Sequence, residues 1–351
     1  MRVLVTGHLG YIGTVLVPLL LAQGHEAVGL DSDLFRGSTF GGAAGLQIQP
    51  IPELKKDIRD IAAADLAGFD AVFHLAGLSN DPLGHFNPAL THEINCLATI
   101  QLAKLAKQAG VSRFVFSSSC SNYGAGGQDW LTEESPLHPM TPYGRSKVEA
   151  EQALNALADD DFSPTHLRNA TAYGASPRLR FDLVLNNLVA WAFTTGRVYI
   201  KSDGTPWRPI VHIEDISRAF IAVLDAPREV VHQQAFNVGR NEDNYQIKAI
   251  AELVKEAVPN CNVEYALDGK PGPSCYRVDC SKIQHLLPHF QPQWTARKGV
   301  QQLYKLLKHT GLTLEEFEGA RYNRIDHVHD LIAHQKITLQ LRWTPTAVPT
   351  N

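Results

Sequence analysis

A glycine-rich turn near the start of the chain constrains the fold more than any other feature. The motif G-H-L-G-Y-I-G at residues 7–13 separates a short apolar run, Val3–Thr6, from a longer one, Ile12–Gln23. The short run predicts a buried strand and the longer one a buried helix. Glycines between them allow a tight turn and a close approach of the backbone to a ligand. The motif therefore predicts a strand, a turn and a helix whose N-terminus can bind an anion.

Strand-like and helix-like segments alternate through the first half of the chain. Further strands are predicted at Glu26–Leu30, Ala71–His74, Arg113–Ser117 and His166–Arg168, and helices at His92–Ala109 and Tyr143–Leu157. Such alternation predicts an α/β fold with a Rossmann-type, doubly wound parallel sheet covered on both faces. Pro18 should kink or shorten the first helix, because proline lacks a backbone donor.

The alternation loosens beyond Tyr173, where proline and glycine interrupt the segments. We expect residues 1–173 to form a dinucleotide-binding domain. Residues 208–240 should return to the sheet of that domain. Residues 174–343 should form a smaller C-terminal α/β region that mainly binds substrate. Residues 344–351, which contain two prolines, should form a poorly ordered tail.

The charge balance argues against two classes of partner. The chain has 32 Lys and Arg against 36 Asp and Glu, a net charge of -4, and no run of five basic residues. Nucleic acids and anionic membranes are normally bound by basic patches, so we expect neither partner. The uncharged stretch Val3–His25 resembles a signal peptide, but its three glycines interrupt the apolar segment.

The cysteines and histidines predict no metal site. There are 15 histidines, and their close pairs, His285 with His289 and His327 with His329, are assigned to surface or packing roles. Five cysteines without a C-x-x-C pair indicate neither a disulfide framework nor structural zinc, and fit a reducing, cytoplasmic compartment. They are Cys96, Cys120, Cys261, Cys275 and Cys280.

Asp31 stands at the end of the second predicted strand, in the position that contacts the ribose of a bound dinucleotide. Its carboxylate can accept hydrogen bonds from a ribose diol and would repel a 2′-phosphate. Asp31 therefore favours NAD over NADP. Arg36, five residues later, is the one residue that favours NADP. The alternative is that the glycines serve packing alone and Asp31 caps the strand.

The chain resembles the extended short-chain dehydrogenase/reductases, and among them the NAD-dependent nucleotide-sugar epimerase/dehydratase family. The glycines are spaced G-x-x-G-x-x-G, and further motifs follow in the order of that family. They are D-I-R-D at 57–60, H-L-A-G at 74–77, Asn95, S-S-S at 117–119, Y-G-R-S-K at 143–147, R-P-I-V-H-I-E-D at 208–215 and N-V-G at 237–239. The resemblance implies that NAD is bound by Gly7, Gly10, Tyr11, Ile12, Gly13, Asp31, Asp57, Ile58, Leu75, Ala76, Gly77, Asn95, Ser117, Tyr143 and Lys147.

Tyr143 and Lys147 are four residues apart and share one face of the predicted helix. An ammonium near the phenol favours the phenolate, and the positive nicotinamide ring of NAD⁺ would act in the same direction. With both charges close, we expect the pKa of Tyr143 to fall towards the working range of a general base. By itself Y-x-x-x-K is more often an ordinary helix face. The resemblance implies that Tyr143 is the base, that Lys147 also binds the nicotinamide ribose, and that Ser119 hydrogen-bonds the reacting sugar hydroxyl, with Ser118 as the nearest rival.

The two residues after Ser119 distinguish between reactions of the family. They are Cys120 and Ser121, whereas the 4,6-dehydratases of the family usually have Asp-Glu there. Dehydration is therefore disfavoured, and 4-epimerisation needs no further acid or base. Cys120 is one residue away from the place of the cysteine in 3,5-epimerases, and an inert buried thiol is the favoured interpretation.

Several polar residues are candidates for substrate binding. The resemblance places a phosphate-binding arginine at Arg208, and Arg277 is a second candidate. Asn187 or Asn186 could donate hydrogen bonds to the same phosphates. Ser79 and Asn80 follow a predicted strand at the edge where α/β sheets bind ligands, although an ordinary turn explains them almost as well. Cys120 and Ser121 complete the predicted sugar pocket.

These inferences together predict an NAD-dependent nucleotide-sugar epimerase that oxidises a sugar hydroxyl transiently, most readily at C4, and returns the hydride. Similar proteins dimerise through the helices predicted at His92–Ala109 and Tyr143–Leu157, so we expect a homodimer. The alternatives are a net oxidoreductase, namely a 4-keto reductase or a dehydrogenase, and a dehydratase. A non-catalytic NAD-binding regulator is the alternative of another class.

Overall fold

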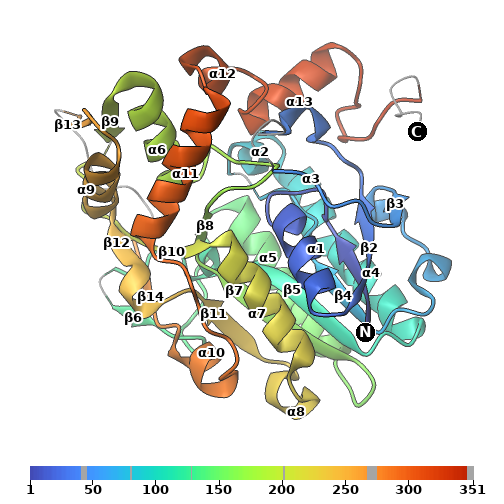
Figure 1. Cartoon of the computed structure of the whole chain (residues 1–351). Coiled ribbons are helices and arrows are strands. Elements are labelled where there is room, and N and C mark those ends of the chain that lie inside the picture. Colours follow the sequence, from blue (N-terminus) through green and yellow to red (C-terminus); the bar gives the residue numbers. More distant parts are fainter. Residues whose placement is uncertain (41–45, 80, 128, 201, 267–274, 346–351) are drawn as a thin grey trace.

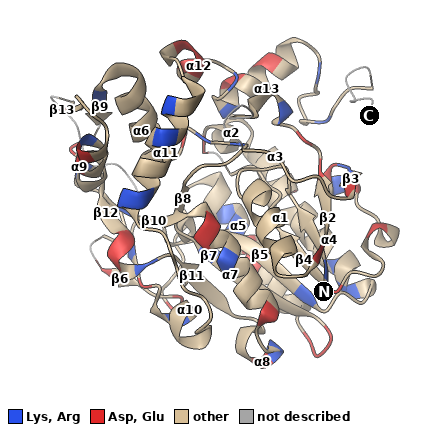
Figure 2. Ribbon diagram, in the orientation of Figure 1, with Lys and Arg blue, Asp and Glu red and all other residues tan. Residues whose placement is uncertain are grey.

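The computed structural model describes the chain except for residues 41–45, 80, 128, 201, 267–274 and 346–351. Asn80 and most of the predicted tail therefore lie outside the described residues. Within the described part, no helix is long and apolar enough to cross a membrane. Charged residues of both signs are scattered over the ribbon (Figure 2).

A seven-stranded sheet forms the centre of the molecule (Figure 1). Its order is β11-β7-β5-β4-β1-β2-β3, and every pairing is parallel. The strands are β1 (Arg2–Thr6), β2 (Glu26–Asp31), β3 (Glu53–Lys55), β4 (Ala71–His74), β5 (Arg113–Ser119), β7 (Ser163–Asn169) and β11 (Ala235–Val238). The predicted α/β class with a parallel sheet is confirmed. Because β1 pairs with β2 on one side and β4 on the other, the strand order reverses at β1, where such sheets bind ligands.

Helices cover both faces of this sheet. One apolar cluster joins it to α1 (Gly13–Ala22) and α7 (Ile213–Asp225), and a second joins it to α4 (Ala98–Gln108) and α5 (Pro142–Leu157). Before α4 come α2 (Asp81–Phe86), α3 (Pro88–His92) and the π-helical segment η5 (Glu93–Leu97). Pro18 lies inside α1, which nevertheless continues to Ala22.

A smaller region lies beside the carboxyl edge of the sheet. Its strands are β8 (Thr171–Tyr173), β10 (Trp207–His212) and β12 (Asn244–Gln246) in one sheet, β9 (Arg197–Ile200) paired with β13 (Asn262–Tyr265), and β6 (Trp130–Leu131) paired with β14 (Arg277–Val278). A third apolar cluster joins its helices α6 (Val184–Thr195), α9 (Ile247–Ala257) and α11 (Ala296–Thr310).

Short helices connect the larger elements. The α-helical ones are α8 (Arg228–Val231), α10 (Ser281–Leu286), α12 (Leu314–Glu318) and α13 (Arg324–Ala333). The 3-10 turns are η1 (Arg36–Ser38), η3 (Ile58–Asp60), η4 (Ala63–Leu66), η6 (Cys120–Tyr123) and η7 (Asn241–Asp243).

Residues 328–343 pack against the elements of the central sheet instead of staying with the smaller region. Val328 of α13, Ile337 and Leu341 belong to the apolar cluster of β1 and α4. The indole of Trp343 donates to the carbonyl oxygen of Ser32, just after β2, at 2.6 Å. Figure 1 shows α13 and the segment after it above α2 and β2. The C-terminal segment therefore packs where the central strands end.

Candidate active site

A cavity of about 590 Å³ opens at the carboxyl ends of the central strands. Residues from the ends of β1, β2, β4 and β5 form one wall, and residues of the loop after β8 form another. The cavity thus lies at the point where the strand order reverses, as expected for a ligand site of such a sheet.

The glycine-rich turn lies against the loop that follows β4. A Cβ on Gly7 would lie 2.7 Å from the amide nitrogen of Ala76, and Gly7 has a φ of +75°. A Cβ on Gly13 would lie 2.4 Å from the carbonyl oxygen of Gly7. Side chains there would break the turn and fill space beside the N-terminus of α1. The turn is therefore shaped as a cradle for a diphosphate, which helix N-termini bind without charged side chains.

Asp31 is fixed at the wall of the cavity by two backbone donors. Its Oδ2 accepts a hydrogen bond from the amide of Leu9 at 3.0 Å, and its Oδ1 accepts one from the amide of Asp33 at 2.8 Å. The carboxylate keeps free acceptor sites, since each oxygen has two lone pairs. A ribose diol fits this position, so the turn and the carboxylate together fit NAD.

All of the predicted cofactor residues except Asn95 line the cavity. Those at the wall are Gly7, Gly10, Tyr11, Ile12, Gly13, Asp31, Asp57, Ile58, Leu75, Ala76, Gly77, Ser117, Tyr143 and Lys147. Asn95 is not among the lining residues. Its side-chain amide accepts from the amide of Leu78 at 2.7 Å and donates to the carbonyl of Leu78 at 2.9 Å. Asn95 thus holds the loop after β4 in place from behind.

Ser119, Tyr143 and Lys147 all line the cavity. Helix α5 begins with Thr141, whose Oγ1 accepts from the amide of Gly144 at 3.1 Å, followed by Pro142 at the first helical position. This N-terminal cap fixes the first turns of α5, from which Lys147 reaches the end of β5. The rival Ser118 donates its hydroxyl hydrogen to Glu151, whereas the Oγ of Ser119 accepts from the amide of Ser121 at 3.1 Å and keeps its own proton to donate.

The expected fall in the pKa of Tyr143 depends on the charge of the nicotinamide ring as well as on Lys147, and it stays a prediction, because the groups of the protein by themselves shift this pKa upwards. Burial raises the pKa of Tyr143 to about 12, although a hydrogen bond with Ser119 and the charge of Arg180 oppose it. Burial also lowers the pKa of Lys147 to about 7, against the opposing effect of Glu151. The Nζ of Lys147 donates to the carbonyl oxygen of Ser117 at 2.8 Å. A large fraction of Lys147 is therefore neutral at pH 7, and burial is the largest influence on the pKa of the phenol.

The predicted substrate residues divide into two groups. Ser79, Ser121 and Arg208 line the cavity. Cys120, Asn187 and Arg277 are not among its lining residues. These three expectations were based on sequence order, which does not fix the direction of a side chain.

Each of the other three residues has a different environment. The Sγ of Cys120 donates to the carbonyl oxygen of Arg168 at 3.1 Å, and burial raises the pKa of this thiol far above its usual range. The amide of Asn187 donates to the carbonyl of Phe181 at 2.8 Å. The guanidinium of Arg277 lies 5.0 Å from the ring centres of both Trp130 and Trp207. Cys120 is thus a buried thiol, as the favoured interpretation expected.

Several lining residues carry no motif and were missed by the sequence argument. Arg178, Arg180 and Asp182 come from the loop after β8, Tyr276 from the segment before β14, and Arg324 from α13. Arg180 donates to both carboxylate oxygens of Asp182, at 3.0 and 2.6 Å, and to the hydroxyl of Ser79 at 2.8 Å. The charged residues at every second position from 178 to 182 were the one available signal in the sequence.

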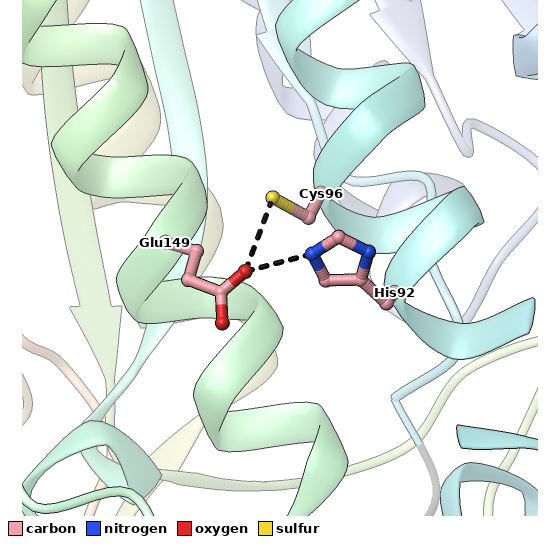
Figure 3. A group of neighbouring side chains, drawn as sticks. All are labelled: His92, Cys96 and Glu149. Carbon is pink, nitrogen blue, oxygen red and sulfur yellow. Dashed lines mark hydrogen bonds and ion pairs between the residues drawn. The ribbon is translucent and has the colours of Figure 1, made fainter. Parts of the chain in front are cut away.

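His92, Cys96 and Glu149 form a group outside this cavity (Figure 3). Their potential ligand atoms lie within 4.8 Å of one another, between the α3–η5 segment and α5. The Nε2 of His92 lies 2.7 Å from a carboxylate oxygen of Glu149. Burial raises the pKa of Cys96 to about 11, and the charge of Glu149 adds to this. Since the contact between His92 and Glu149 joins two helical segments, we interpret the group as a structural link between them.

Residues 3–239 match the model of a protein family described as "NAD dependent epimerase/dehydratase family". A UDP-glucose 4-epimerase of Mycolicibacterium smegmatis is 33% identical over 248 residues, which cover 68% of this chain and 77% of that protein. A UDP-glucose 4-epimerase of Bacillus subtilis is 28% identical over 330 residues, covering 86% and 94%.

Solved structures show the same arrangement of the chain. MoeE5 in complex with UDP-glucose and NAD has a TM-score of 0.74 and 26% identity, and the match covers 89% of this chain and 100% of that one. The dTDP-glucose 4,6-dehydratase DesIV of Streptomyces venezuelae, with NAD and TYD bound, has a TM-score of 0.74 and 25% identity, covering 88% and 97%.

Proposed function

The chain belongs to the NAD-dependent epimerase/dehydratase family, and on this premise we propose that it is a nucleotide-sugar 4-epimerase. It is an enzyme whose cofactor is NAD. The observation that carries the proposal is that Ser119, Tyr143 and Lys147 line one cavity. The two residues after Ser119 are Cys120 and Ser121, and neither has a carboxyl group. This arrangement supports removal of a proton from a hydroxyl and lacks the acid and base that dehydration needs at those positions.

The first step is the removal of the hydroxyl proton. The hydroxyl of Ser119 holds the sugar hydroxyl, and the phenol oxygen of Tyr143 takes its proton. NAD, when bound, supplies the acceptor and donor of the hydride and a positive charge close to the phenol. Because burial raises the pKa of Tyr143 to about 12, the phenol is protonated at neutral pH until such a charge lies beside it. Proton abstraction is thereby restricted to the loaded site.

The second step is the return of the proton after the ketone has turned. Tyr143 donates its proton back to the carbonyl oxygen while Ser119 holds that oxygen. Lys147 keeps its place through the hydrogen bond to the carbonyl of Ser117. A planar carbonyl can be reduced on either face, so inversion at C4 requires no residue beyond these three.

Arg208 supports a substrate with a diphosphate. Arg208 comes from β10 and lines the cavity with Tyr276, and an arginine binds phosphate oxygens through charge-assisted hydrogen bonds. The relatives described above are UDP-glucose 4-epimerases. We therefore propose a UDP-hexose as the first substrate to test.

The test combines identification of the cofactor with a labelling assay. The cofactor released by denaturation is identified, and the enzyme is incubated with UDP-, GDP-, CDP- and dTDP-hexoses in D₂O. An epimer without deuterium supports internal return of the hydride. Deuterium beside the carbonyl carbon would instead indicate a 3- or 5-epimerase or a dehydratase, and turnover that needs added NAD(P)H would indicate a reductase.

Tyr143→Phe checks the assignment of the base. We expect turnover to fall by about 10²- to 10⁴-fold, with nucleotide-sugar affinity nearly unchanged, because the lost hydroxyl acts mainly in the transition state. Tyr199→Phe is the matched control, since Tyr199 is exposed on β9. Full activity of Tyr143→Phe would remove the base from the proposal.

We also propose that the enzyme is a homodimer joined through α4 and α5. The two helices pack beside each other, and Leu97, just before α4, is 52% exposed. A partner helix pair would cover this apolar side chain. Sedimentation of the wild type and of Leu97→Asp tests the interface, and an unchanged mass of the variant would contradict it.

A further inference from the structure

Three arginine side chains of low exposure line the cavity. Arg178 and Arg324 are 4% and 6% exposed, and the side chain of Arg180 is 12% exposed. Asp31 and Phe35 line the same cavity. Buried guanidinium groups normally have acceptors for their hydrogens, so the partners of each show which of them is available to a ligand.

Arg180 is satisfied by protein groups, whereas Arg178 and Arg324 are not. Arg178 pairs with Asp33 through Nη2, at 2.8 Å, but its Nε and Nη1 are buried without a hydrogen-bond partner. The guanidinium of Arg324 lies 3.7 Å from the ring centre of Phe35. It takes part in none of the hydrogen bonds or ion pairs found among the described residues. Burial, reinforced by the charges of Arg180 and Arg178, lowers the pKa of Arg324 to about 9.

Arg178 is tied to the start of α1. The hydroxyl of Ser176 donates to the carbonyl of Tyr11 at 2.9 Å and is hydrogen-bonded to the hydroxyl of Thr14, also at 2.9 Å. It also accepts from the amide of Arg178 at 3.1 Å. The backbone of Arg178 is therefore fixed against the same turn that forms the diphosphate cradle.

Arg324 reaches the cavity because residues 320–343, here termed the C-terminal clasp, wrap around the segment after β2. Arg321 donates to the carbonyls of Gly37 and Thr39, at 3.2 and 2.9 Å. Trp343 donates to the carbonyl of Ser32 at 2.6 Å, and Leu341 lines the cavity. The clasp lies outside residues 3–239, which match the family model.

We propose that the C-terminal clasp closes the adenosine end of the cavity and that Arg324, together with Arg178, binds the diphosphate of NAD. The anion supplies the acceptors that both guanidinium groups lack, and the clasp slows release of the cofactor. The proposal depends on NAD as the cofactor and not on the identity of the sugar, so it can fail while the proposed epimerase activity stands.

Arg324→Gln tests the contact with the diphosphate, and Arg297→Gln is its control, because Arg297 is an exposed arginine of α11 paired with Glu256. NAD retained by the purified protein is measured first. Binding of ADP and of adenosine to the stripped protein is then measured by calorimetry. We expect Arg324→Gln to retain less NAD and to bind ADP at least about tenfold more weakly, as for loss of a charge-assisted hydrogen bond, with adenosine affinity unchanged.

Either of two outcomes would overturn the diphosphate contact. One is an ADP affinity of Arg324→Gln within twofold of the wild type, and the other is an equal loss for ADP and adenosine. Arg178→Gln should show the same selective loss for ADP, and Arg324→Lys, which keeps a cation, should recover part of it. These two variants keep the test decisive if Arg324→Gln does not fold.

Trp343→Ala tests the clasp itself. Loss of its anchor to Ser32 should speed the dissociation of NAD from the loaded enzyme, measured by dilution into excess ADP. The ratio of ADP to adenosine affinity should stay as in the wild type, because both arginines remain. A dissociation rate equal to that of the wild type would show that the segment does not retain the cofactor.

Discussion

Replacing Lys147 by methionine should stabilise the cofactor-free protein at neutral pH, and the gain should shrink as the pH rises. Lys147 is 3% exposed, and its Nζ lies 4.4 Å from the ring centre of Phe116. Burial lowers its pKa to about 7, with Glu151 opposing the effect. Methionine has a side chain of similar length and no charge to remove from water.

The size of the effect follows from the change in pKa. One pKa unit corresponds to about 1.4 kcal/mol, so a fall from 10.5 to about 7 corresponds to a cost of roughly 5 kcal/mol for the fully protonated amine. Between these two values the unfolded chain binds more protons than the folded one, so wild-type stability rises with pH by about 1.4 kcal/mol per unit. The variant loses the hydrogen bond to Ser117, worth about 1 kcal/mol.

The assay is urea unfolding followed by tryptophan fluorescence, at pH 7.5, 8.5 and 9.5. The protein is freed of nucleotide first, because a bound ligand adds its own contribution to stability. From pH 7.5 to 9.5 the advantage of Lys147→Met over the wild type should fall by about 3 kcal/mol. Lys104→Met replaces an exposed lysine of α4 and should show no such trend.

Parallel stability curves for the wild type and Lys147→Met would refute the reasoning. They would mean that Lys147 keeps its proton in the folded state across this pH range. A large neutral fraction of Lys147 at pH 7 would then be excluded as well.

Two further variants test the support of the site. Glu151→Gln should cost about 3–5 kcal/mol in urea unfolding, because it leaves the buried guanidinium of Arg168 unpaired, whereas Glu256→Gln, in an exposed pair, should cost less than about 1 kcal/mol. The pKa of Glu151 is lower in the folded protein than in the unfolded chain. Its contribution to stability is therefore fully present above the unfolded carboxyl pKa and is lost as the pH falls through the folded value. The stability difference between the wild type and Glu151→Gln should shrink accordingly in acid. Gly13→Ala should abolish retention of NAD in the purified protein, because its Cβ would lie 2.4 Å from a carbonyl oxygen of the turn. Gly24→Ala is the control: its Cβ meets nothing within 4 Å, and its φ of +80° makes the substitution cost stability, but the folded variant should retain NAD. NAD content at the wild-type level in Gly13→Ala would contradict the proposed cradle.

Residues that belong to local motifs were found from the sequence, and residues brought in by distant segments were not. Asp31, Tyr143 and Lys147 could be placed because each stands at the end of a strand or on one face of a helix, within a few residues of an apolar run. Arg178 and Arg324 could not, because the first lies in a loop and the second in a helix that returns from the end of the chain. Neither has a periodic pattern that points to the cavity.

The parallel sheet, the glycine turn and the chain positions that face the carboxyl edge could be predicted from the sequence, because hydrophobic periodicity and glycine geometry act over a few neighbouring residues. The effect of burial on the pKa of Tyr143 and the position of Arg277 beside two tryptophans could be seen only in the folded chain. Desolvation and charge depend on every group packed around a side chain, and those groups come from segments that are far apart in the sequence.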